Sequence, residues 1–162
     1  MTTAVLNRRN LLAAGGSVVA TGVSGLLLPA RAQGLAPTPS MSGGSNNYRK
    51  GAPTVDRIGK GGFWMSGTVR RAGDGAPLAG QRIQIWAHTT DGQEHEPQSH
   101  GATLTDKDGK FRLEMPQIIP IFGQPHGHLA YDSGEFKTVF LRPIMKSAKD
   151  KSLEAHFVLQ AA

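Results

Sequence analysis

Apolar and polar positions alternate along the chain from about residue 63 onward, in short runs separated by turn residues. In residues 81–86, Ile83 and Ile85 alternate with Arg82 and Gln84. A period of two places alternate side chains on opposite faces of a strand, so each run predicts a β-strand with one buried face. The strands predicted in this way are residues 63–69, 81–86, 102–105, 110–115, 126–131, 136–141 and 154–159.

The segments between these runs carry turn chemistry. Residues 71–80 contain several glycines and a proline, and Asp106-Lys107-Asp108-Gly109 separates two of the runs as a hairpin turn would. Asp106 and Asp108 also resemble part of a calcium loop, but a tight turn is the ordinary explanation. Because no stretch between residue 33 and the C-terminus has a helical period, the sequence predicts an all-β fold, an antiparallel β-sandwich.

Composition divides the chain into three parts. Residues 33–61 are rich in Gly, Pro, Ser, Thr and Asn and have few large apolar side chains, so they predict a flexible or extended arm. Residues 62–162 then form a domain of about 100 residues, which is the usual size of a small β-sandwich.

Residues 1–32 have the pattern of a bacterial twin-arginine export signal. Arg8 and Arg9 precede a mildly apolar stretch, and Ala30-Arg31-Ala32 offers small residues for cleavage before Gln33. A membrane anchor is the alternative, but the stretch carries several glycines and is barely long enough to span a bilayer. The sequence therefore predicts a periplasmic or secreted protein. The twin-arginine route exports folded proteins, often with a cofactor already bound.

Charge and cysteine content exclude several function classes. The chain has 18 Lys and Arg against 12 Asp and Glu, but three of the arginines lie in the export signal, so 15 basic residues remain in the mature part. These are scattered among few aromatic residues, which argues against a nucleic-acid partner. We expect no membrane association after signal cleavage. The absence of cysteine excludes disulfides, thiolate metal ligands and a cysteine nucleophile.

The most informative motif is His126-Gly127-His128, which lies in a predicted strand. Residues at i and i+2 of a strand leave the same face, so both imidazoles point to one side. Two neutral imidazoles on one face can chelate a transition metal. The alternative is a pair of partly exposed polar residues without a ligand.

The order of motifs around this pair resembles the C-terminal catalytic domain of the intradiol ring-cleavage dioxygenases, the catechol and protocatechuate dioxygenases. The resemblance covers residues 63–141: the strand ending in Trp86, a polar loop over residues 88–101, the hairpin 105–111, the Pro-bounded loop 116–125 and the His-x-His strand. The first half of this pattern is equally similar to transthyretin-like and carboxypeptidase-regulatory-like β-sandwiches. A non-catalytic binding module of that kind, with or without a metal, is therefore the alternative function.

The resemblance implies non-haem iron held by His126 and His128, and a catechol-type aromatic diol cleaved with O2. In the family two tyrosinates complete the iron site. Here Glu94 or His95 falls at the first tyrosine position and Ile119 at the second, and Gln124 falls where the family has an arginine. The chain has two tyrosines. Tyr131 is expected on the opposite face from the histidine pair. Tyr48 lies in the arm, so it could serve as a ligand only if the arm, or the arm of a neighbouring subunit in an oligomer, folds back onto the site.

Two ligand sets follow from these departures. His126, His128 and Glu94 would form a site suited to Fe(II), Mn(II) or Zn(II), whereas His126, His128 and His95 would suit Zn(II) or Cu(II). Loop 88–101 holds three of the six histidines, including His95 and His100. An apolar wall beside the site is expected from Ile118, Ile119, Ile121 and Phe122. No residue can be assigned as catalytic from the sequence.

Overall fold

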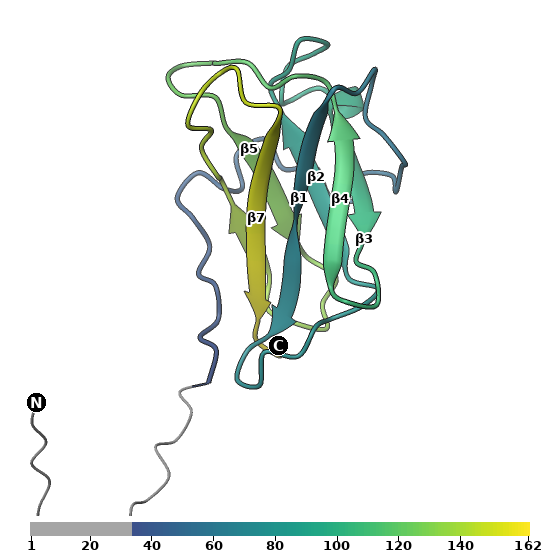
Figure 1. The fold of residues 1–162 in the computed structure, drawn as a ribbon, viewed down its shortest axis with the longest axis vertical. Coiled ribbons are helices and arrows are strands. Elements are labelled where there is room, and N and C mark those ends of the chain that lie inside the picture. Colours follow the sequence, from purple (N-terminus) through teal and green to yellow (C-terminus); the bar gives the residue numbers. More distant parts are fainter. Residues whose placement is uncertain (1–33) are drawn as a thin grey trace, which may run out of the picture. The chain divides into compact units, whose positions relative to one another are not determined.

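The computed structural model describes residues 34–162, so the predicted export signal lies outside the described part of the chain. Over these residues the chain forms seven strands and one short 3₁₀ helix (Figure 1). They are β1 (Phe63–Arg71), β2 (Arg82–Ala87), η1 (Pro97–Ser99), β3 (His100–Leu104), β4 (Lys110–Met115), β5 (Gly127–Tyr131), β6 (Val139–Leu141) and β7 (Ser152–Leu159). Residues 34–162 contain no helix with the length and hydropathy that crossing a bilayer requires.

The strands form two sheets that pack face to face. One sheet has the order β4-β1-β7 and the other has the order β3-β2-β5-β6. Figure 1 shows β7, β1 and β4 as one layer in front of β5, β2 and β3. The predicted all-β sandwich is thus confirmed.

One strand pair departs from the antiparallel pattern. β1 and β7 are parallel, with Trp64 opposite Ser152 and Arg71 opposite Leu159. The period-two pattern of a strand says which face is buried but nothing about the direction of its neighbour. Direction is set by the connection, since the chain leaves β6 in one sheet and crosses to the other before β7 begins.

The core lies between the two sheets and is filled by alternate positions of the strands. Met65 and Val69 of β1 face Ile85 of β2 and Leu129 of β5, and all four have no exposed surface. Full burial of such a side chain contributes about 1.5–3 kcal/mol. These alternating positions account for the two layers.

The arm, residues 34–61, contains isolated bridges but no strand, and it runs along the outer face of the sheet that contains β2 and β5. The Asn46 carbonyl accepts a hydrogen bond from Trp86 Nε1 (2.9 Å), and the Arg49 carbonyl accepts one from Gln84 Nε2 (2.8 Å). The composition of the arm predicted few side chains to bury. It carried no information about the surface that the sheet offers to the arm. β2 and β5 offer apolar surface and side-chain donors on their outer face, so the arm packs without a large apolar content of its own.

Candidate metal centre

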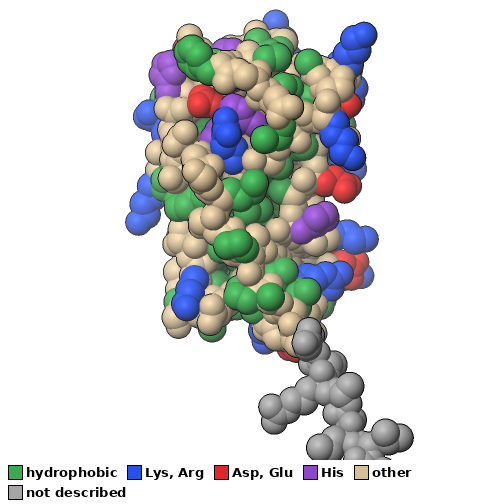
Figure 2. Space-filling view, turned by 90° about the vertical axis from the view of Figure 1, so that its left-hand side faces the viewer, with side chains coloured by type: hydrophobic (Ala, Val, Ile, Leu, Met, Phe, Trp, Pro, Cys, Tyr) green, Lys and Arg blue, Asp and Glu red, His purple; other side chains and the backbone are tan. Residues whose placement is uncertain are grey.

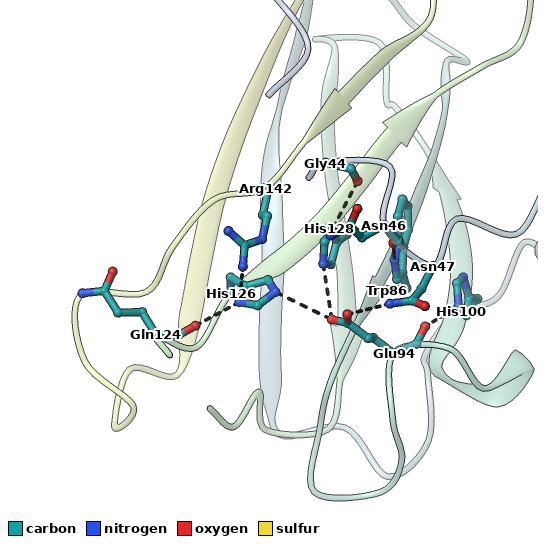
Figure 3. Close-up of polar contacts among 10 residues, drawn as sticks. All are labelled: Gly44, Asn46, Asn47, Trp86, Glu94, His100, Gln124, His126, His128 and Arg142. Carbon is teal, nitrogen blue, oxygen red and sulfur yellow. Dashed lines mark hydrogen bonds and ion pairs between the residues drawn. The ribbon is translucent and has the colours of Figure 1, made fainter. Parts of the chain in front are cut away.

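Three side chains converge at one end of the sheet (Figure 3). Glu94 Oε2 lies 3.6 Å from His126 Nε2 and 3.3 Å from His128 Nε2. His128 belongs to β5, His126 immediately precedes that strand, and Glu94 lies in the loop between β2 and η1. Within residues 34–162 this is the one group of His, Asp and Glu side chains with three ligand atoms all within 4.8 Å of one another.

The fourth candidate ligand, His95, is not part of this group. Its side chain is exposed, while the neighbouring Glu94 is partly buried and points toward the histidine pair. The two residues lie in a turn, and only Glu94 has a ligand atom within reach of both histidines. The structure therefore brings together the carboxylate ligand set and not the three-histidine set.

The hydrogen bonds of the two histidines fix which ring nitrogen carries the proton. His126 Nδ1 lies 2.9 Å from the Gln124 carbonyl oxygen, and His128 Nδ1 lies 3.1 Å from the Gly44 carbonyl oxygen. A carbonyl oxygen only accepts, so in both rings Nδ1 donates and a neutral Nε2 presents a lone pair. Metal-binding histidines in proteins usually have this arrangement, with the second nitrogen bonded to a carbonyl or carboxylate.

Three acceptor atoms therefore face one another with no donor between them. Glu94 Oε2 and His128 Nε2 are buried and have no hydrogen-bond partner among the described residues. Buried polar atoms without partners are rare and costly, and a bound cation removes that cost. Two imidazole nitrogens and a carboxylate oxygen also match the donor preference of Fe(II), Mn(II) and Zn(II), so the residues fit a metal ion.

Burial supports the neutral state of His128. Loss of hydration lowers the pKa of His128 below its ordinary value of 6.5, although its bond to the Gly44 carbonyl and the charge of Glu94 act in the opposite direction. The His128 side chain has no exposed surface. The lowered pKa favours the neutral imidazole, the form in which histidine binds metals.

A row of three stacked rings crosses the sheet beside the centre. Trp86 stacks on His128, with ring centroids 5.2 Å apart, and on His100 of β3 at 5.5 Å, because the strand register places the three residues opposite one another. His100 Nε2 donates to the Glu94 backbone carbonyl at 2.8 Å. Burial lowers the pKa of His100 as well. The row thus links the loop that carries Glu94 to the strand that carries His128.

The arm supplies two further contacts that the sequence did not reveal. Asn47 Nδ2 donates to Glu94 Oε1 at 2.6 Å, which leaves Oε2 facing the histidines. Asn47 has a positive φ of 58°, a conformation that asparagine tolerates better than most residues. The second contact is the Gly44 carbonyl at His128. The sequence did not indicate a role for Asn47 or Gly44. The arm has no periodic pattern of apolar residues, so its contacts with the sheet could not be predicted.

Both tyrosines of the chain are engaged elsewhere. Tyr48 does fold back, and its ring contacts Trp86 and Phe140 with centroids 5.7 and 5.1 Å away, but its hydroxyl donates to Asp132. Tyr131 is buried in the core between the sheets, where its hydroxyl accepts from the Phe136 backbone N–H at 3.2 Å. It lies on the opposite face from the histidine pair, as expected from its spacing.

The predicted apolar wall beside the site does not include Ile118. Ile118 is fully buried in the core between the sheets and cannot face the centre. Ile119 and Ile121 are partly buried and Phe122 is fully exposed. Ile118 pairs with Thr89 in an isolated bridge, and this contact directs it inward.

A pocket with a volume of about 490 Å³ lies away from this centre. It is lined mainly by β1, β4 and β7, with Thr68, Arg112 and His156 among its residues, and it contains none of the three converging side chains. The three converging side chains therefore lie outside this pocket.

Comparison with known proteins identifies the fold. Hydroxyquinol 1,2-dioxygenase from Pseudomonas putida DLL-E4 superimposes with a TM-score of 0.58 over 79% of this chain and 68% of its own, at 14% sequence identity. 3-Chlorocatechol 1,2-dioxygenase from Rhodococcus opacus 1CP gives 0.58 over 80% and 74%, at 16% identity. The dioxygenase domain of a dioxygenase carbohydrate-binding protein fusion from Streptomyces sp. SirexAA-E gives 0.58 over 78% and 99%, at 15% identity.

The chain therefore has the fold of the catechol and hydroxyquinol 1,2-dioxygenases, as its resemblance to the intradiol dioxygenases implied. No family model matches the sequence, and no curated protein matches it either. At this level of identity the likeness is one of fold, and the activity has to be argued from the site.

Proposed function

We propose that this protein is an exported, metal-dependent dioxygenase that cleaves a catechol-type aromatic diol with O2. The observation that carries the proposal is the convergence of Glu94 Oε2 with the Nε2 atoms of His126 and His128, with no donor between them, in a fold shared with dioxygenases. Export is proposed from the twin-arginine pattern of residues 1–32, and it places the activity in the periplasm or outside the cell.

Glu94, His126 and His128 would hold the metal, and we propose non-haem iron. When bound, iron would supply the Lewis-acid and redox chemistry that joins a diol to O2. Glu94 or His95 falls at the position at which the resemblance expects the first tyrosine ligand, and of the two it is Glu94 that faces the histidine pair, so a carboxylate would replace a tyrosinate. A set of two histidines and one carboxylate suits the ferrous ion better than the ferric ion that tyrosinates stabilise.

The chain's own residues hold and shield this donor set. Asn47 fixes Glu94 Oε1, two backbone carbonyls fix the imidazoles, and Trp86 stacks on His128. Two large apolar side chains that remain exposed, Phe122 and Ile144, belong to the segments flanking His126, since Ile144 pairs with His126 in an isolated bridge. They offer apolar surface for an aromatic ring. Near the upper end of the face in Figure 2, acidic, basic and histidine side chains lie next to one another.

The first test is metal content together with the visible spectrum of the mature protein, purified after native export. We expect close to one equivalent of iron and no tyrosinate-to-iron absorption band, because the Tyr48 and Tyr131 hydroxyls bond elsewhere. Oxygen consumption with catechol then tests the reaction. Protein that takes up no metal on titration would leave a β-sandwich binding module and end the enzyme proposal.

Variants separate the ligand set from its surroundings. His126→Ala and Glu94→Ala should lose metal and oxygen consumption while remaining folded. His95→Ala is the matched control, because this histidine is adjacent in sequence but exposed, and it should retain both. If His126→Ala still binds one equivalent of metal, the site is wrongly assigned.

A further inference from the structure

Trp86 connects the metal centre to a tyrosine that reaches the surface. Its ring stacks on His128, with centroids 5.2 Å apart and planes 9° apart (Figure 3), and the Tyr48 ring lies 5.7 Å from it on another side. Trp86 has no exposed surface, whereas Tyr48 is partly exposed. Aromatic rings in contact exchange electrons readily, so these three rings form a continuous path from a candidate metal ligand toward solvent.

The hydrogen bonds of the two oxidisable rings set the direction of electron transfer. Trp86 Nε1 donates to the Asn46 carbonyl oxygen at 2.9 Å, and a carbonyl oxygen is too weak a base to take up the indole proton. The Tyr48 hydroxyl donates to Asp132, and a carboxylate can take up a proton. A tyrosine that loses an electron becomes a strong acid, so transfer of its proton to Asp132 stabilises the radical at Tyr48.

The surroundings of Asp132 suit it to accept this proton. Burial raises the pKa of its carboxyl group above the ordinary value of 3.8, and a raised pKa makes the carboxylate a stronger base. Arg82 Nη1 lies 3.7 Å from Asp132 Oδ1, and this contact orients the carboxylate beside Tyr48.

We propose that Trp86 and Tyr48 form a protective electron-transfer path, which reduces one-electron oxidants produced from O2 or hydrogen peroxide at the centre when no diol is bound. Trp86 gives one electron to the oxidant, and Tyr48 then gives one electron to Trp86 and its hydroxyl proton to Asp132. The oxidant is thus reduced by one electron, Trp86 returns to its starting state, and Tyr48 becomes a neutral radical. A reductant in solution can reach this radical, and the proton returns from Asp132 as Tyr48 is reduced. The inference rests on the proposed function for the source of the oxidant, whereas electron transfer between the two rings needs no metal.

The first test therefore follows electron transfer in protein without metal. The chain has two tryptophans, so Trp64→Phe leaves Trp86 alone, and a laser flash that tryptophan absorbs and tyrosine does not removes one electron from it. We expect the absorption of the tryptophanyl radical to decay while that of a tyrosyl radical grows at the same rate, independently of protein concentration. Tyr48→Phe in this background should lose the growth. Asp132→Asn, which keeps an oxygen acceptor without the base, should slow it by about tenfold or more.

Tyr131→Phe is the matched control, because it removes the same hydroxyl from the other tyrosine of the chain, which lies in the core between the sheets. It should retain the growth of the tyrosyl radical. A tyrosyl radical that survives Tyr48→Phe, or no tyrosyl radical in the Trp64→Phe protein, would overturn the inference and leave the proposed function in place.

The second test connects the path to the centre. Protein loaded with Fe(II) is treated with hydrogen peroxide, and oxidation of Trp86 and His128 is measured by peptide mass spectrometry. Tyr48→Phe should increase this oxidation severalfold, while Tyr131→Phe should leave it unchanged. Equal oxidation in the wild-type protein and Tyr48→Phe would overturn the protective role. If the wild-type protein takes up no iron, the proposed function and the protective role both fail.

Discussion

At the scale of single residues, Glu94 determines what the centre can bind. Its Oε2 faces two imidazole nitrogens whose protons are directed away, and its Oε1 is held by Asn47. A carboxylate in this place contributes a hard oxygen ligand with one full negative charge, whereas a tyrosinate would contribute a chromophore as well. The residue therefore favours a colourless divalent ion over the coloured ferric centre.

Gly67 sets how closely two strands approach. A Cβ at this position in β1 would lie 1.6 Å from the Ala155 backbone oxygen of β7, and backbone atoms cannot move aside as a flexible side chain can. We expect Gly67→Ala to lower the free energy of unfolding by at least about 2 kcal/mol, measured by urea denaturation. Ser66→Ala, one residue earlier and only partly buried, is the control and should stay within about 0.5 kcal/mol of wild type. Equal stability of Gly67→Ala and wild type would contradict the β1–β7 packing.

The histidine pair was predictable and its third partner was not, for a physical reason. His126 and His128 lie two apart in an apolar run, and the period of a strand places them on one face from local geometry alone. Glu94 and His95 lie in a loop, where no period applies, so the sequence left both open. In the folded chain Glu94 is bonded by His100 at its backbone carbonyl and by Asn47 at its side chain, and no local pattern of the sequence encodes either contact.

At the scale of elements, the arm acts through two contacts with the ligands. Replacing Asn47 with glycine keeps its positive φ accessible but removes the amide that holds Glu94 Oε1. Loss of a contact that orients a metal ligand usually weakens metal affinity by 10- to 100-fold, so we expect about tenfold weaker Zn(II) binding for Asn47→Gly by competition with a chelator.

The neighbouring Asn46 gives the matched control for the arm. Its backbone carbonyl accepts from Trp86, but its side chain makes no hydrogen bond within residues 34–162, so Asn46→Gly changes the same residue type without touching Glu94. It should bind Zn(II) within about twofold of wild type, since exposed substitutions away from such contacts have small effects. Equal weakening in both variants would mean that arm flexibility, and not the amide, is responsible.

The hairpin between β3 and β4 depends on the charge of Asp106. Its Oδ1 accepts the backbone N–H groups of Asp108 and Lys110, both at 2.9 Å, and the bond from Lys110 is the main cause that lowers the Asp106 pKa below its ordinary 3.8. A carboxyl whose pKa is lowered on folding adds stability above its unfolded pKa and loses it as pH falls through the folded pKa.

The expected result for this hairpin is a pH-dependent difference between two proteins. Asp106→Asn keeps an oxygen acceptor for both N–H groups but no charge, so it should be less stable than wild type near pH 7. The difference in stability should narrow as pH falls below the ordinary aspartate pKa of 3.8, because the unfolded chain takes up a proton first and folded Asp106 takes one up only at lower pH. Asp108→Asn is the control, because its carboxylate contacts only the Lys107 ammonium in an exposed pair worth about 0–1 kcal/mol. A gap that stays constant with pH would show that the turn does not depend on the Asp106 charge.

Strand positions were therefore accessible from the sequence, while strand directions and the course of the arm were not. The run 110–115 alternates so regularly that β4 begins and ends where predicted. The parallel pairing of β1 with β7 joins residues more than 80 positions apart, and no local pattern encodes it. The arm binds through backbone carbonyls, which every residue has, so its composition could not identify its partners.

At the scale of the whole molecule, the centre connects segments that are distant in the sequence. The arm, the loop after β2 and the start of β5 meet at Glu94, and the row His100-Trp86-His128 joins three strands behind them. These segments have no ligand geometry until the sandwich is assembled. A metal that binds this geometry should therefore bind the native protein far more tightly than the unfolded chain.

Metal binding should then raise the stability of the entire domain. A ligand that binds only the native state at 100 times its dissociation constant adds about 2.7 kcal/mol, which shifts the thermal midpoint of a domain this size by several degrees. We expect Zn(II) to produce this shift in wild-type protein, followed by circular dichroism, and to produce none in His126→Ala. His156→Ala removes an exposed histidine of β7 that bonds to Thr68, away from the centre, and should keep the shift. If Zn(II) still raises the thermal midpoint of His126→Ala, the stabilising metal binds elsewhere. If the rise is lost only in His156→Ala, the metal binds on the sheet that contains β7.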